Sequence, residues 1–272
     1  MRRRQLLAGV GTVASATLAG CFGAVFGTTV SESFENSYDV TDETTLTVSN
    51  RNGNVTVRDT DDEQLTVAGE KRAGSEDALD EISVDVTTGD QFAVQVSFGS
   101  GSAFEQRSVD LTIDVPRGVT VDQLATSNGT VSASDVSGDV SASTSNGNVE
   151  MTDVDGYVDC DTSNGNVRVR GATGLDGART SNGTVDVELL AMRGDVTCES
   201  SNGGVTVRVG PDVSAAFRLS TTNGQVSVQN LQHTSSGSQR GLIEGQLRGG
   251  SSPTLTAETT NGDVRLRPAD TE

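Results

Sequence analysis

Apolar and polar residues alternate in short runs from Thr45 onward, the pattern of β-strands with one buried face. A helical turn is predicted over 75–81, because Ser75 is a favourable N-cap with Glu76 and Asp77 after it. Residues 44–118 are therefore predicted to form a β-rich region that continues directly into the second half of the chain. Its alternating runs lie at 45–48, 55–57, 65–67, 82–86, 92–98 and 109–115.

The rest of the chain repeats a turn signal. Most copies read Thr/Ser-Ser-Asn-Gly-x-Val, and the first four are spaced by 18 residues. Asn and Gly tolerate positive φ, and a Gly about midway between pairs (138, 156, 174 and 194) marks a second turn. Such a period predicts an all-β fold, a β-solenoid of about 18-residue coils with two short strands each, over 119–267. The turn-forming pairs are Asn128 and Gly129, Asn146 and Gly147, Asn164 and Gly165, Asn182 and Gly183, Asn202 and Gly203, Asn223 and Gly224, and Asn261 and Gly262.

One unit predicts the register of all the others. After Gly147, Val149 and Met151 face inward, because side chains alternate along a strand. Stacking then gives the inward column Val131, Val149, Val167, Val185, Val205, Val226, and it places Arg168 between Glu150 and Asp186 on the outer face. Seven coils at about 4.8 Å give a rod of roughly 34 Å. Residues 231–252 break the period and are predicted to be a long loop with a strand at 242–247, and 268–272 form a tail.

The first 21 residues have the pattern of an export signal. A basic start precedes a short run rich in Gly, Ala, Ser and Thr, which is a signal peptide rather than a membrane span. Arg3 and Arg4, followed by two leucines, resemble a twin-arginine signal, and Leu18-Ala19-Gly20-Cys21 resembles a lipobox. Lipidation of Cys21 would anchor the protein on the extracellular face of the cell membrane. The alternative is an ordinary signal with a chance cysteine. Residues 22–43 are predicted to be a flexible tether.

The charge of the exported chain is strongly negative. Without the three signal arginines, 16 basic and 38 acidic residues remain, a net charge of −22. Such a chain repels nucleic acid, so a nucleic-acid partner is excluded. With Lys71 as its only lysine, the composition resembles that of proteins from salt-loving archaea, which remain soluble when salt screens their acidic surfaces. A merely acidic surface protein is the alternative.

Three blocks in order carry a family resemblance: the strand-turn-strand at 45–58, Val109 to Gly118, and the Ser-Asn-Gly-x-Val repeats. Together they resemble the β-strand-repeat "putative adhesin" family over about residues 44–267. That family is a domain of unknown function found in envelope proteins. It has no established catalytic residues, so the resemblance implies none here.

Few residues offer catalytic or metal chemistry. His233 is the single histidine of the chain and lies in the irregular stretch 231–252, so neither a Ser-His-Asp triad nor a multi-histidine metal site is predicted. No cofactor or metal is predicted, since the aspartates at 135, 153, 155, 159 and 161 do not recur in each half-coil as calcium repeats require. Asn54, Asn128 and Asn182 begin glycosylation sequons that the turn chemistry also explains. The Thr column at 126, 144, 162 and 180 resembles an ice-binding face, but each Thr precedes a turn, where it is expected to hydrogen-bond the backbone.

No disulfide is predicted between Cys160 and Cys198. Both lie four residues after a turn glycine and share one inward column, with Ala178 between them. Two coils would separate their Cα atoms by roughly 9.6 Å, whereas a disulfide needs less than about 7 Å. They are expected to be buried free thiols.

The sequence favours a non-catalytic, adhesin-like binding or structural module of the envelope, with an unidentified glycan or protein ligand. A β-helical polysaccharide-processing enzyme is the first alternative, although no carboxylate pair or basic catalytic cluster stands out. A scaffold that assembles end to end through exposed coil edges is the second.

Overall fold

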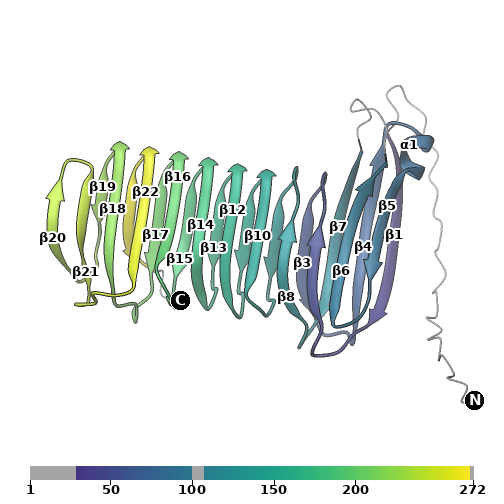
Figure 1. Ribbon diagram of the computed structural model, residues 1–272, viewed down its shortest axis with the longest axis horizontal. Helices are drawn as coiled ribbons and strands as arrows, with labels where there is room; N and C mark the ends of the chain where they lie inside the picture. Colours follow the sequence, from purple (N-terminus) through teal and green to yellow (C-terminus); the bar gives the residue numbers. More distant parts are fainter. Residues whose placement is uncertain (1–28, 100–106, 270–272) are drawn as a thin grey trace, which may run out of the picture.

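The computed structural model describes residues 29–99 and 107–269, which form a long rod of two facing β-sheets (Figure 1). One sheet has 11 strands and the other has 12. The signal residues Arg3, Arg4 and Cys21 lie outside the described residues. Within those ranges, no helix has the length and apolar character that a membrane crossing requires.

The N-terminal region has both sheets and one short helix. Ser75 caps that helix, accepting a hydrogen bond from the Ala78 amide, as predicted. The elements are β1 (Val30–Asp39), β2 (Thr45–Ser49), β3 (Val55–Thr60), β4 (Gln64–Ala73), α1 (Glu76–Asp80), β5 (Ile82–Thr87), β6 (Gln91–Phe98) and β7 (Ser108–Pro116).

The solenoid continues both sheets without a break, because β2 pairs with β8 and β3 pairs with β9. Its strands are β8 (Thr120–Ala125), β9 (Val131–Ser134), β10 (Val140–Asn146), β11 (Val149–Thr152), β12 (Tyr157–Asn164), β13 (Val167–Arg170), β14 (Gly174–Asn182), β15 (Val185–Leu189), β16 (Val196–Asn202), β17 (Val205–Val209), β18 (Ala215–Asn223), β19 (Val226–Val228), β20 (His233–Gln239), β21 (Leu242–Leu247), β22 (Thr254–Asn261) and β23 (Val264–Pro268).

Residues 30–39 are not a flexible tether, as the sequence suggested, but the edge strand β1. It pairs antiparallel with β4 along its whole length. Its inward-facing apolar residues are Val30, Phe34 and Tyr38, which are four residues apart. The strand therefore lacks the alternation of apolar and polar residues that marks the other strands. Phe34 packs over Gly69, and Tyr38 meets Phe92 edge-on at 5.3 Å. These rings cover the N-terminal end of the core, and the strand is held mainly by backbone pairing.

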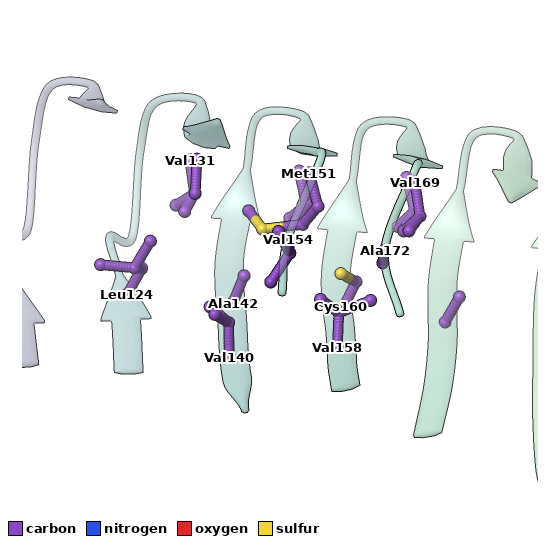
Figure 2. Packing of buried hydrophobic residues seen from close by; sticks show 14 of the residues in the cluster. Leu124, Val131, Val140, Ala142, Met151, Val154, Val158, Cys160, Val169 and Ala172 are labelled. Atoms are coloured by element: carbon purple, nitrogen blue, oxygen red, sulfur yellow. The ribbon is translucent and has the colours of Figure 1, made fainter. Parts of the chain in front are cut away.

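The coils stack in the predicted parallel register. Val149 lies between Val131 and Val167, and Cys160 lies between Ala142 and Ala178. Figure 2 shows the two halves of the core facing each other, with Met151 opposite the smaller residues of the other sheet. Val149, Met151, Val158 and Cys160 are fully buried. Larger side chains on one sheet are matched by smaller ones on the other, so the thin core is filled.

The order of the last coils differs from the sequence order. The C-terminal coil, β22 and β23, is inserted between the coil of β16 and β17 and the coil of β18 and β19. The inward column therefore runs from Val205 to Val264 and only then to Val226. Figure 1 shows the consequence: the chain ends in the body of the rod, not at its tip.

The far tip is closed by an antiparallel hairpin. The strand predicted at 242–247 is β21, which pairs with β18. The residues before it are a second strand, β20, and not the predicted loop. His233 accordingly begins a strand, with its ring 6.0 Å from that of Phe217. Strand β20 was missed because its sequence is almost wholly polar, so only backbone pairing identifies it.

Candidate functional site

The Asn-Gly turns form one continuous edge of the rod. We call this edge the amide rim. It consists of the asparagines of eight coils and the residue before each; the asparagines, in spatial order, are Asn52, Asn128, Asn146, Asn164, Asn182, Asn202, Asn261 and Asn223.

Glycine is required after each asparagine because the coils approach closely here. Gly147 has φ +154°, and a Cβ at this position would overlap the carbonyl of Gly129 in the neighbouring coil. Gly165 has the same relation to Gly147, and Gly183 to Gly165. The turn glycines thus set the coil spacing as well as the turn.

The asparagine side chains form a hydrogen-bonded ladder along this rim. Asn146 Nδ2 donates to Asn128 Oδ1 at 2.8 Å, and Asn164 Nδ2 donates to Asn146 Oδ1 at 2.9 Å. The pattern continues to the tip, where Asn223 donates to Asn261 at 3.0 Å. At the other end Asn52 Nδ2 donates to the Arg107 carbonyl at 3.2 Å. Because all the bonds run in one direction, the carboxamides are held in a straight, exposed row.

Beneath the ladder lies the predicted threonine column, whose hydroxyls bond the backbone as expected. Thr144 Oγ1 donates to the Gly129 carbonyl at 3.0 Å, and Thr162 Oγ1 donates to that of Gly147 at 2.9 Å. Both threonines are buried. This column is therefore part of the interior and not a flat outer face of the ice-binding kind.

The opposite edge of the rod differs sharply in charge. Its turns carry aspartates, and Arg193 ties several coils together there by pairing with Asp139 at 2.5 Å and also with Asp176. Arg193 also lies over the Tyr157 ring at 4.3 Å. The Tyr157 amide, and then Arg193, hold the pKa of Asp139 below its usual value. We call this edge the acidic rim; its aspartates are Asp135, Asp139, Asp153, Asp155, Asp176 and Asp195.

The acidic surface gives a prediction about salt. Lowering the salt from molar to about 0.1 M lengthens the Debye length from about 3 Å to about 10 Å, so repulsion between carboxylates grows. We expect the melting temperature of the protein without residues 1–21 to fall as the salt is lowered. Calorimetry over this range checks it, and a constant or rising melting temperature would remove the argument for a salt-adapted protein.

On the outer face of the 11-stranded sheet, Arg168 lies in register between Glu150 and Asp186, as predicted, but the ion pairs there involve other arginines. Asp186 pairs with Arg170 at 2.7 Å and with Arg208. Burial raises the pKa of Asp186, and the hydrogen bonds from the two arginines more than offset this, so its pKa lies below the usual value. The long arginine side chains reach across strands to a partly buried carboxylate, which register alone does not predict.

The other sequence candidates do not form a catalytic or metal centre in the described ranges. No three His, Cys, Asp or Glu side chains gather there as metal ligands. A hollow of about 310 Å³ is lined by acidic turn residues near Arg117. Asp61 in this hollow is 86% exposed and pairs with Arg117 at 2.8 Å, so it lacks the desolvation that tunes a catalytic acid.

The three sequon asparagines differ in how they are held. Asn128 and Asn182 belong to the ladder, where the Nδ2 of each donates to one neighbouring asparagine and the Oδ1 of each accepts from the other. Asn54 lies outside the ladder, and its Oδ1 accepts from the Thr130 amide at 2.9 Å. All three side chains are fixed by hydrogen bonds to neighbouring coils, so each asparagine has a structural role apart from its sequon.

These paired sheets, with their repeated Asn-Gly turns, agree with the sequence profile that the chain matches. The profile of the Toastrack DUF4097 family matches residues 43–172 and again 123–267. The chain belongs to this family. The two overlapping matches show that the Toastrack pattern covers the N-terminal β region and the solenoid alike. No curated protein matches the chain at a significant level.

Solved structures similar to this Toastrack chain are distant in sequence. A "putative adhesin" from Bacteroides fragilis is 14% identical, with a TM-score of 0.42, and covers 88% of this chain and 97% of its own. A "putative cell adhesion protein" from Clostridium sporogenes is 11% identical, with a TM-score of 0.35, and covers 88% and 100%. A "putative lipid binding protein" from Parabacteroides distasonis is 10% identical, with a TM-score of 0.35, and covers 87% and 96%.

Proposed function

We propose that this protein is a non-catalytic, lipid-anchored module of the cell envelope that presents its solenoid as a binding or structural surface outside the membrane. The observation that carries the proposal is the straight, hydrogen-bonded rim, which runs through eight coils of a rigid rod. Stacked repeats of this kind offer extended surfaces for polymers or proteins. Within the described ranges no three His, Cys, Asp or Glu side chains gather as metal ligands, and Asp61 in the hollow is exposed, so we favour binding over the polysaccharide-processing alternative.

The rod's ends argue against the self-assembling alternative. At the tip the 11-stranded sheet stops with β19, which has only three residues, and β20 and β21 turn antiparallel. At the other end the edge strand β1 carries Glu32 and Glu35. Short edges and edge charges are devices that prevent strand pairing between molecules. Light scattering at increasing protein concentration tests this alternative, because end-to-end assembly would raise the measured mass.

The proposed function is tested by capture of envelope material. Mature protein is immobilised through its C-terminus and exposed to solubilised envelope at molar salt. Specific retention of a polysaccharide or a protein supports a binding module. Retention of nothing, together with turnover of an envelope polysaccharide, would instead identify an enzyme.

Anchoring has its own test at Cys21. Replacing Cys21 with serine removes the thiol that the acyl group requires, and two acyl chains are what make membrane attachment stable. We expect Cys21→Ser protein to appear in the medium or to accumulate unprocessed. Cell fractionation measures this, with the buried-site variant Cys160→Ala as a control that should stay with the membrane. A Cys21→Ser protein that fractionates like the wild type would refute the lipid anchor.

A further inference from the structure

We infer that the amide rim binds an uncharged, linear polysaccharide laid along the rod. The inference rests on the proposed function, since it names the surface and the ligand class of that binding module. Four observations on the rim support it: its charge, its unused hydrogen-bonding groups, its lack of apolar anchors and its repeat.

The amide rim is depleted of charge in a chain where 21% of the residues are charged. Its five central turns contain no Asp, Glu, Lys or Arg at all. The outer turns contain Arg51, which belongs to the rim, and Asp263, which follows Gly262. The acidic rim, on the other edge of the same coils, keeps its aspartates. Charged side chains keep such a protein soluble, so they are favoured over its whole surface. The uncharged strip departs from this rule, and we attribute the departure to the binding of an uncharged ligand.

The rim also has hydrogen-bonding groups that the fold does not use. Ser145, Ser163 and Ser181 are exposed, and none of their hydroxyls makes a hydrogen bond within the described ranges. Asn146 and Asn182 each use one amide hydrogen for the neighbouring asparagine and keep a second for solvent or ligand, whereas Asn128 and Asn164 also donate to a backbone carbonyl. The ladder by itself stabilises the rod, but it explains neither the serine row nor the missing charge.

The chemistry of the rim excludes other partner classes. The central turns present no aromatic or large apolar side chain, and these are the anchors of protein interfaces. Without arginine or lysine there, they cannot hold an anionic polymer, and without carboxylates they cannot hold a cation. Hydroxyl and amide groups suit the hydroxyls of a neutral sugar.

The repeat points to a linear polymer rather than a single sugar. Equivalent groups recur at about 4.8 Å, so eight coils extend over roughly 34 Å. A shallow rim gives little affinity for each sugar, but many repeated contacts with one chain add through effective concentration. We therefore expect affinity to rise steeply with glycan length.

The test uses full-length mature protein and polysaccharide from the same cells' envelope, separated into neutral and acidic fractions. The rim variant combines Ser145→Asp and Ser181→Asp, which lie two coils apart and leave every observed hydrogen bond in place. The control combines Ser141→Asp and Thr152→Asp, which are exposed on the outer faces of the two sheets and add the same charge. Melting curves confirm that both variants fold.

We expect the wild type and the control to bind the neutral fraction equally at low and molar salt, and the rim variant to lose at least about tenfold in affinity. Binding of the rim variant like the wild type, or binding only to the acidic fraction with loss at high salt, would overturn the inference. Retention of an envelope protein but no polysaccharide would overturn the polysaccharide inference while leaving the proposed binding function intact. If the protein retains no envelope material, both the inference and the proposed binding function fail.

Discussion

Replacing Gly147 with alanine should destabilise the solenoid by about 3 kcal/mol or more. The residue has φ +154°, and a Cβ there would collide with the Gly129 carbonyl, which is backbone and cannot turn aside. The collision also separates two coils, so the hydrogen bonds of Asn146 and Thr144 would be strained with it. Chemical denaturation followed by circular dichroism measures the loss.

Gly194 supplies the matched control. It lies in the second set of turns, and a Cβ built on it meets nothing within 4 Å. Gly194→Ala should therefore change stability by no more than about 0.5 kcal/mol. If the two substitutions cost the same, close stacking of the Asn-Gly turns does not determine the coil spacing.

Cys160 and Cys198 should be inert to thiol reagents in the folded protein and fully reactive after denaturation. Both are completely buried, and burial raises the pKa of Cys198 to about 12 and that of Cys160 further still. The reactive thiolate is therefore strongly disfavoured in the folded protein at neutral pH. Titration with a thiol reagent, before and after adding denaturant, checks this. Reaction of either thiol at its free rate in the native protein would contradict the packed core.

The same pair tests the register. Ala178 lies between the two cysteines in the stack, so they are two coils apart and should not bridge. Ala257 is the direct neighbour of Cys198, at one coil spacing of about 4.8 Å, which suits a disulfide. Under oxidising refolding, the Ala257→Cys variant should form a bridge between Cys198 and the introduced thiol, whereas the wild type forms none. Peptide mapping that found Cys160 joined to Cys198 would show the register to be wrong.

Local chemistry explains how much of this fold could be predicted. The turn at Asn146-Gly147 is encoded by those two residues themselves. The inward orientation of the Val149 and Met151 side chains follows from the alternation of side chains along a strand. The threonine column is equally local, since each hydroxyl reaches a backbone carbonyl of the next coil. These features recur at a fixed period, so one coil predicts the others.

The features that were missed depend on contacts far apart in sequence. Strand β1 has too few apolar residues to show alternation and is recognised only by its pairing with β4. The position of the last coil was missed because Val264 fits equally well beside Val205 or beyond Val226. The uncharged rim was visible as repeated Ser-Asn pairs, but its meaning required the stack, which brings those pairs into one row opposite an acidic edge.

The inserted C-terminal coil has a consequence for how the chain is made. During synthesis the N-terminal coils leave the ribosome first and can stack as they emerge. The coil of β18 and β19 cannot complete its pairing at that stage, because β22 and β23, which separate it from β16 and β17, follow it in the sequence. A chain cut short before β22 would therefore lack an internal layer of the rod, and β18 and β19 would lose the parallel neighbours on which they stack. The rod therefore becomes continuous only after β22 and β23 have been made, so its folding cannot simply follow the order of synthesis from one end to the other.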